Sequence, residues 1–178
     1  MTDDNQSQKR EWMQSVLDRF EGPLTRYAAQ ITGDVERARD VVQDTFVRLC
    51  DEDRERLEEH LAEWLFTVCR NRALDVRRKE SRLRPLGEGR LEACESADPS
   101  PSMIVERREA TSEVLQVIQT LPENQQEVIR LKFQNGLSYR EISQVTHLSV
   151  TNVGFLLHTA IKTVRLKLKA DSGVAQKT

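Results

Sequence analysis

Two helix-start signals stand close together between Ser138 and Lys169, and no other feature restricts the fold of the chain as tightly. Ser138 can cap one helix, and Glu141 can reach back to the Ser138 amide. Ser149 can cap a second helix. About three residues must reverse the chain between the helices, and His147 is the expected residue at positive φ, since histidine tolerates that conformation better than most non-glycine residues. The pattern predicts a helix-turn-helix, whose second helix can lie in the major groove of DNA.

The second helix of this motif combines an apolar face with a polar one. Apolar residues recur at steps of three and four, and we expect the following to face the domain core: Val153, Leu157, Ile161 or Ala160, Val164 and Leu168. The opposite side is predicted to contact DNA bases through Ser149, Thr151, Asn152, Phe155, His158, Thr159 and Lys162. Lys162, Arg165, Lys167 and Lys169 can reach phosphates. The alternative for this segment is a helical hairpin whose polar face is only solvated.

Charge is unevenly distributed along the chain, whose formal net charge is −2. Residues 70–84 hold seven Lys or Arg against two acidic residues, a net charge of +5, and residues 111–178 hold eight against five, a net charge of +3. Residues 51–63 hold seven acidic residues against two Arg, a net charge of −5. Because phosphate affinity depends on local charge, the two basic regions predict two nucleic-acid contacts on one chain. A solvated charged surface is the alternative for either region.

Helical periodicity covers most of the remaining chain, and no strand-like alternation competes with it. The first half is predicted to form helices over 12–20, 24–31, 34–49 and 61–79. Gly22-Pro23 and Gly33 separate the first three, and Asp34 is the expected N-cap of the third. We therefore expect an all-α fold.

The second half begins after a stretch with few apolar side chains that could form a core. Residues 81–102 hold three of the five prolines and two of the seven glycines, which predicts a flexible linker. Helical spacing resumes over 103–119, and a further helix is expected to have Pro122 as its first residue and Gly136 just beyond its end. The predicted organisation of the 178 residues is a domain at 1–80, a linker at 81–108, a four-helix domain at 109–170 and a disordered tail at 171–178.

Composition and spacing exclude several classes of protein. No apolar run is long enough to span a membrane, and the N-terminus lacks the apolar core of a signal peptide, so we expect a soluble, cytoplasmic protein with no membrane contact. Cys50, Cys69 and Cys94 are widely spaced and odd in number, which favours small buried or linker residues over a disulfide framework or a zinc site. The sequence has no Gly-rich phosphate loop, metal-ligand spacing or nucleophile with a nearby base. We expect no enzymatic activity, no metal and no cofactor.

Three stretches, in this order, resemble the extracytoplasmic-function (ECF) family of bacterial sigma factors. Two are similar to the sigma-2 domain of the family: ITGDVERARDVVQDTFVRL (31–49) and AEWLFTVCRNRALDVRRK (62–79). The third, LPENQQEVIRL (121–131), opens a region similar to the sigma-4 domain. The resemblance covers nearly the whole chain outside the linker and the two tails. It implies a protein that binds core RNA polymerase, directs it to promoter DNA and assists strand opening.

The sigma-2 resemblance implies two contact sites. The helix over 34–49 would bind the clamp helices of the polymerase largest subunits through Asp40, Gln43, Asp44, Phe46 and Val47. Phe46 fits a buried position equally well. The helix over 64–79 would bind the minus-ten promoter element, with a base contact from Asn71 and backbone contacts from Arg70, Arg77, Arg78 and Lys79. Trp64 is expected in the core rather than stacked on a base.

The sigma-4 resemblance implies that the second helix of the helix-turn-helix reads the minus-35 element. The chain departs from the family here, because Gly154, Phe155, Leu156, Thr159 and Ile161 stand where basic or polar residues are common. This shortage of charge predicts weak phosphate binding, so that promoter contact depends on tethering to polymerase. An anti-sigma partner is common in the family, and the sequence identifies none. The alternative function is a free-standing helix-turn-helix regulator, which would bind a palindromic operator without polymerase.

Overall fold

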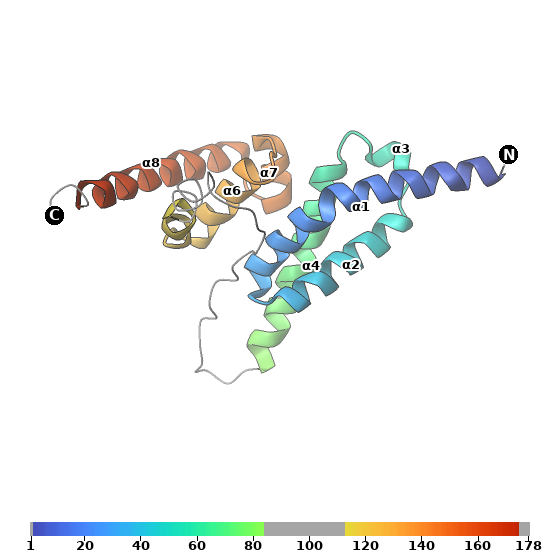
Figure 1. Ribbon diagram of the computed structural model, residues 1–178, viewed down its shortest axis with the longest axis horizontal. Coiled ribbons are helices and arrows are strands. Elements are labelled where there is room, and N and C mark those ends of the chain that lie inside the picture. Colours follow the sequence, from blue (N-terminus) through green and yellow to red (C-terminus); the bar gives the residue numbers. More distant parts are fainter. Residues whose placement is uncertain (1, 84–112, 175–178) are drawn as a thin grey trace, which may run out of the picture. The chain divides into compact units, whose positions relative to one another are not determined.

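The computed structural model describes residues 2–83 and 113–174, and the chain divides into two units, Met1–Cys94 and Glu95–Thr178. Every regular element within these two ranges is a helix (Figure 1). The predicted all-α fold class is therefore confirmed. Among the described helices, none combines the length and the apolar character that a membrane span requires.

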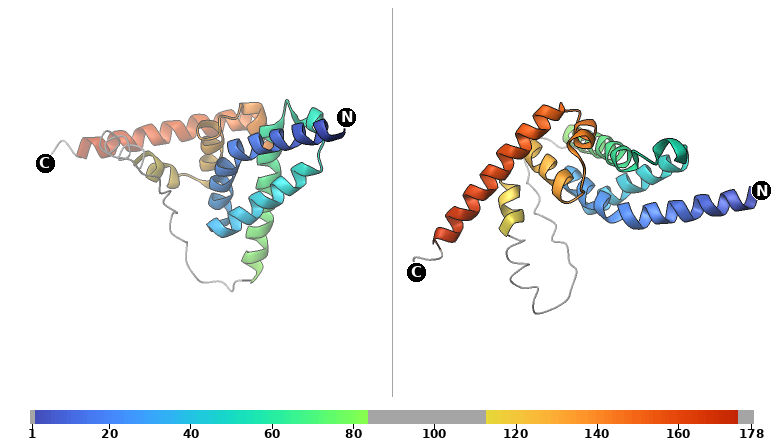
Figure 2. Two further views of the ribbon diagram at one scale, coloured as in Figure 1. Left: turned by 45° about the vertical axis from the view of Figure 1, so that its right-hand side comes forward. Right: turned by 90° about the horizontal axis from the view of Figure 1, so that it is seen from above.

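The described part of the first unit consists of α1 (Thr2–Thr32), α2 (Val35–Cys50), α3 (Arg54–Leu57) and α4 (Leu61–Leu83). α1, α2 and α4 pack against one another and enclose the core (Figure 2). Leu24 of α1, Leu49 of α2 and Leu65 of α4 are fully buried there. The rings of Tyr27 and Phe66 meet edge to face with 5.3 Å between their centroids, a geometry that aromatic pairs favour.

α1 continues without interruption through Pro23, where the sequence predicts a break between two helices. Proline removes one backbone hydrogen bond and crowds the preceding turn, at a cost of about 3 kcal/mol. Val16 and Phe20 are buried before the proline, and Leu24 and Ala28 continue the same buried face after it. Each large apolar side chain contributes about 1.5 to 3 kcal/mol on burial, so the continuous face offsets the cost. The helix bends partway along its length, as helices that contain proline commonly do (Figure 2).

The turn between α1 and α2 agrees with the sequence prediction. Gly33 has a φ of +72°, a conformation that glycine adopts without steric cost. The Asp34 carboxylate accepts a hydrogen bond from the Arg37 backbone N–H at 2.9 Å. Asp34 is therefore the N-cap of α2, as expected.

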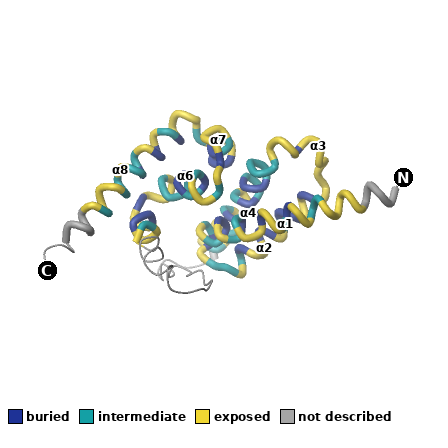
Figure 3. Tube along the Cα trace, turned by 45° about the horizontal axis from the view of Figure 1, so that its top comes forward, coloured by how far each residue is buried: buried dark blue, intermediate teal, exposed yellow. Residues whose placement is uncertain are grey.

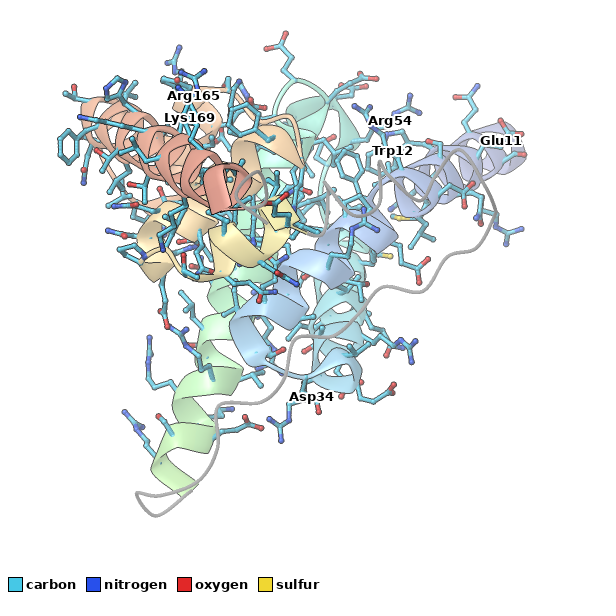
Figure 4. The ribbon with its side chains drawn as sticks, turned by 60° about the vertical axis from the view of Figure 1, so that its left-hand side comes forward. Glu11, Trp12, Asp34, Arg54, Arg165 and Lys169 are labelled. Carbon is cyan, nitrogen blue, oxygen red and sulfur yellow. The ribbon has the colours of Figure 1, made fainter. Side chains whose placement is uncertain are left out.

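The acidic stretch between α2 and α4 contains the one-turn helix α3, where the sequence predicts no helix. Two contacts attach the end of α2 and this stretch to the N-terminal half of α1. Lys9 Nζ donates to the Cys50 carbonyl oxygen at 3.0 Å, and the Arg54 guanidinium lies 5.6 Å from the centre of the Trp12 ring (Figure 4). The second distance is within the range of a cation–π interaction. The extended N-terminal part of α1 thus anchors the connection between the other two long helices.

The described part of the second unit consists of a helix over 113–119, α6 (Glu123–Phe133), α7 (Tyr139–Thr146) and α8 (Val150–Val174). Residues 103–112, predicted to begin the first of these helices, lie outside the described residues. Pro122 is the N-cap of α6 rather than its first residue, because its ψ of 145° is extended. Its carbonyl oxygen accepts the N–H groups of Gln125 and Gln126 and so starts the helix.

The helix-turn-helix forms from α7 and α8 as the sequence predicts. Ser138 Oγ accepts the Glu141 N–H at 3.2 Å, and Glu141 Oε2 accepts the Ser138 N–H at 2.7 Å, which completes a capping box. His147 has the expected left-handed conformation, with φ 59° and ψ 27°. Ser149 Oγ accepts the Asn152 N–H at 3.2 Å and caps α8. Local hydrogen bonds thus define where both helices begin.

Two helices extend beyond the limits predicted for the domains. α4 ends at Leu83, past the expected limit at residue 80, and α8 ends at Val174, inside the predicted tail at 171–178. No glycine or proline interrupts α4 before residue 85, and Lys, Arg and Glu are good helix formers, so composition alone does not mark this end. The rest of the predicted linker lies outside the described residues.

The cysteines occupy different environments. Cys69 is fully buried in α4, and burial raises the pKa of its thiol to about 12, although a hydrogen bond with Thr45 acts in the opposite direction. The thiol is therefore protonated and unreactive near neutral pH. Cys50 is exposed at the end of α2, so the expectation of a buried or linker position is wrong for this residue. Cys94 lies outside the described residues.

Replacing His147 by glycine should stabilise the second unit by about 0.5 to 1 kcal/mol. A left-handed backbone costs a non-glycine residue about 1 to 2 kcal/mol, and the greater freedom of glycine in the unfolded chain cancels part of the gain. Urea unfolding followed by circular dichroism measures the change. His147→Ala is the matched control, because it keeps Cβ and should bring no stabilisation. Both tryptophans, Trp12 and Trp64, lie in the first unit, so their fluorescence transition should not move. Equal stability of the glycine and alanine variants would contradict the expectation.

Candidate nucleic-acid interface

The basic part of α4 lies where the helix leaves the core. Buried positions on α4 stop at Ala73, and the C-terminal part of the helix extends past α1 and α2 (Figure 1). Arg70 is half-buried, and the other predicted minus-ten residues are exposed: Asn71, Arg77, Arg78 and Lys79. Asn71 and Arg78 are two helical turns apart and share one side of α4. The helix therefore presents an amide and a cation together, which is a suitable arrangement for a base contact beside a phosphate contact.

Two ion pairs join α2 to α4. Asp44 Oδ2 lies 2.8 Å from Arg72 Nε, and Glu80 pairs with Arg37. On each helix the two paired residues are about two turns apart, so the pairs favour one register of α4 on α2. All four side chains are partly exposed, and such pairs contribute about 0.2 to 1 kcal/mol each. Sequence reasoning missed the Asp44–Arg72 pair because its members are far apart along the chain.

The outer side of α2 presents three of the five residues that the family resemblance assigns to polymerase. Asp40 and Gln43 are exposed, and Val47 is 60% exposed. The Asp44 carboxylate already has its partner on α4. Phe46 is only 8% exposed, so its burial favours the core alternative over a direct contact.

α8 exposes most of the residues predicted to contact bases. Its buried positions are Val153, Leu156, Leu157 and Ala160, and they lie in the N-terminal half of the helix (Figure 3). Thr159 is half-buried, and the other predicted base-contact residues are exposed: Ser149, Thr151, Asn152, Phe155, His158 and Lys162. Of the two core alternatives, Ala160 is fully buried and Ile161 only half-buried. Leu156 is a core residue, which accounts for one of the departures from the family pattern.

Tyr139 belongs to the same surface and was missed by sequence reasoning. It is the first residue of α7 and is 43% exposed. A Cβ atom at Gly154 would lie 3.8 Å from the Tyr139 ring, so α8 and this ring are in close contact. Lys132 Nζ lies 5.6 Å from the ring centre, a cation–π distance. No sequence pattern signals this cluster, because its members come from three different helices.

Charge divides α8 into two halves. Residues 149–161 contain no Lys, Arg, Asp or Glu. Lys162, Arg165 and Lys169 are exposed in the second half, and Figure 4 shows the last two on the same side of the helix. Lys167 Nζ donates to Thr120 Oγ1 at 2.6 Å. The helix therefore has an uncharged segment at the turn and a basic segment beyond it.

Among the described residues, Arg130 of α6 also has a shifted pKa. Burial lowers the pKa of its guanidinium, and Nε is buried without a hydrogen-bond partner. The ordinary pKa of arginine is above about 12, so the group stays charged at neutral pH. Within the described ranges, no group of three His, Cys, Asp or Glu side chains is placed to hold a metal ion.

Two protein-family models match the sequence. The model named Sigma-70 region 2 matches residues 16–83, and the model named Sigma-70, region 4 matches residues 111–164. The first match falls in the first unit and includes α2 and α4. The second falls in the second unit and includes α6, α7 and the uncharged half of α8. Each unit thus corresponds to one of the two regions.

Characterised bacterial proteins are similar to the chain over most of its length. The ECF RNA polymerase sigma factor SigL of Mycobacterium tuberculosis is 29% identical over 164 residues, which cover 88% of this chain and 89% of that protein. The ECF RNA polymerase sigma factor SigM of Bacillus subtilis is 26% identical over 160 residues, which cover 89% of this chain and 95% of that protein.

Solved structures share the fold. The sigma factor RpoE, in complex with the anti-sigma factor NepR from Bartonella quintana, is similar with a TM-score of 0.66 and 20% identity, over 91% of this chain and 99% of that one. CnrH, in complex with the cytosolic domain of CnrY, is similar with a TM-score of 0.59 and 25% identity, over 91% of this chain and 90% of that one.

The Asp44–Arg72 ion pair should stabilise the first unit through a coupling energy of about 0.2 to 1 kcal/mol. Asp44→Asn, Arg72→Gln and the double variant form a cycle that isolates this energy in urea unfolding followed by tryptophan fluorescence. The coupling should fall at high salt, because both side chains are partly exposed. Both members of the Glu36–Arg39 pair lie on α2. The same cycle of variants on this pair is the matched control and should give a smaller coupling energy. Zero coupling between Asp44 and Arg72 would show that the pair does not hold the register of α4.

Proposed function

The chain belongs to the extracytoplasmic-function family of sigma factors and has a role in transcription initiation, and we propose that it binds core RNA polymerase, selects promoters and assists strand opening. One observation carries the proposal. Region 2 and region 4 match in this order on two separate units, and each unit exposes residues suited to the contact expected of it.

We assign the polymerase contact to the exposed side of α2. Asp40, Gln43 and Val47 lie at steps of three and four, so they share one side of the helix and offer a carboxylate, an amide and an apolar group together. Phe46 would support this side from the core, and Asp44 would connect it to α4 through Arg72.

We assign the minus-ten element to α4. Unstacking a base costs a few kcal/mol, and proteins that open a duplex offset this cost with stacking and polar contacts to the single strand. The exposed amide of Asn71 can pair with a base edge, and Arg78 on the same side can hold the backbone. Strand opening breaks no covalent bond, so the proposal includes no enzymatic activity and no cofactor.

We assign the minus-35 element to α8. Its uncharged half would face base edges, while Lys162, Arg165 and Lys169 would neutralise phosphates. The N-terminal half of α8 offers no charge to DNA, and weak sites joined on one carrier gain from effective concentration. Polymerase would be that carrier, so the isolated chain should bind promoter DNA weakly.

An anti-sigma factor is a further partner that we propose for this chain. The support is that two similar proteins were solved in complexes, RpoE with the anti-sigma factor NepR and CnrH with the cytosolic domain of CnrY. Because bacterial RNA polymerase works in the cytoplasm, we propose that compartment for the sigma factor as well. A free-standing helix-turn-helix regulator is not favoured, because it leaves the region 2 match of the first unit without a role.

Run-off transcription tests the proposed function. Core polymerase with the purified chain is incubated with genomic fragments, and the start sites are mapped. Transcripts from a limited set of start sites, absent with core polymerase alone, are expected. Tight binding of the chain alone to a palindromic duplex, together with no new transcripts, would support the free-standing regulator instead.

Substituting Asp40 and Gln43 together by alanine should abolish co-elution of the chain with core polymerase in size-exclusion chromatography. Both residues are exposed, so the helical content and unfolding midpoint should stay unchanged. Arg48→Ala is the matched control, because Arg48 is exposed on the same helix but lies on a different side from Asp40, Gln43 and Val47. Undiminished co-elution of the first variant would remove α2 from the polymerase interface.

A further inference from the structure

Phe155 projects into solvent from the second turn of α8. It is 65% exposed, although burial of a phenylalanine side chain is strongly favourable. The helix cannot rotate to bury it, because Leu156 and Leu157 already occupy the core, with 7% and 1% exposure. The packing of its neighbours therefore holds Phe155 on the outer surface.

The part of α8 around Phe155 is uncharged. Its neighbours one turn away along α8 are Thr151 and Asn152 on one side and His158 and Thr159 on the other. This half of the helix contains no Lys, Arg, Asp or Glu. This part of α8 therefore offers an aromatic ring, methyl groups and short polar groups. These groups suit an apolar contact rather than an ion pair with a phosphate.

The second half of α8 identifies duplex DNA as the occupant of this face. Lys162, Arg165 and Lys169 are exposed beyond Phe155 on the same helix, and their positive charge complements the phosphates that border a DNA groove. In a helix-turn-helix, the second helix is the one that enters the major groove. Duplex DNA therefore suits both halves of α8. The uncharged half can make an apolar contact inside the groove, and the basic half places cations at the edge of the groove.

We propose that Phe155 contacts the C5 methyl group of a thymine in the upstream promoter element and makes the second unit selective for thymine at that position. The thymine methyl is the apolar group that base pairs present in the major groove. The contact removes the methyl group and part of the exposed ring from water. This burial of apolar surface is favourable and needs no charged group. This inference rests on the proposed function, because it places α8 on promoter DNA.

Replacing thymine by uracil tests the contact, because the change removes the methyl group and leaves the hydrogen-bonding groups of the base in place. Holoenzyme assembled from the full chain and core polymerase is assayed for open-complex formation on a promoter found by start-site mapping. Each upstream thymine is replaced by uracil in turn. At one position we expect open-complex formation to fall by about fourfold, which is the factor that corresponds to burial of one methyl-sized group. Thymines in the spacer between the two elements should be insensitive.

Two protein variants link the effect to Phe155. Phe155→Ala should reduce open-complex formation on the thymine promoter by a similar factor. Holoenzyme with this variant should no longer distinguish thymine from uracil at the sensitive position. Leu166→Ala is the matched control, because Leu166 is 60% exposed on the same helix but lies beyond the uncharged half. It should retain the full thymine preference. Both positions are exposed, and circular dichroism should show unchanged folds.

The outcomes separate the inference from the function on which it rests. If the chain directs initiation and no upstream thymine is sensitive to loss of its methyl group, the contact is disproved and the proposed function stands. Persistence of the thymine preference in Phe155→Ala also disproves the contact and would turn Phe155 into a candidate protein contact. Absence of any initiation with core polymerase would overturn the proposed function, and the thymine contact with it.

Discussion

The burial of one side of each long helix decides which side chains this protein can offer to a partner. One face of α8 is buried in the core through Val153, Leu157 and Ala160. One face of α4 is buried through Cys69 and Ala73. A small rotation of either helix would expose these groups, at a cost of about 25 cal/mol for each Å² of apolar surface returned to water. The outer faces are therefore set by the inner ones. The candidate contacts with polymerase and DNA follow from core packing rather than from any preference of the exposed residues themselves.

The protein has less free positive charge than its basic segments suggest. Arg72 pairs with the Asp44 carboxylate inside the first unit, and the N-terminal half of α8 has no formal charge at all. Phosphate neutralisation is a large part of the affinity of most proteins for DNA, so each unit is poorly equipped to hold a duplex by itself. The proposed function does not require it to do so, because polymerase would hold both units near the promoter. Low charge also limits binding to DNA away from promoters.

Predictions from the sequence succeeded where the cause is local. The capping box of Ser138, the N-cap at Asp34 and the left-handed His147 all depend on atoms within a few residues of each other. The predicted break at Pro23 failed, because the buried face that carries α1 through it is formed with α2 and α4. The second unit shows the same limit, since the contact between Tyr139 and Gly154 joins two helices and leaves no periodic signal.

The sequence by itself determined that the chain is helical, where most of its helices begin, and which family it resembles. Backbone dihedral preferences and capping hydrogen bonds act over one turn of helix, and the printed residues contain them completely. Tertiary structure alone decided that Phe46 lies in the core, that Ala160 is buried in preference to Ile161, and that Asp44 pairs with Arg72. Burial and ion pairing depend on which helices meet and at what rotation, because dispersion and screened charge interactions act only at short distances.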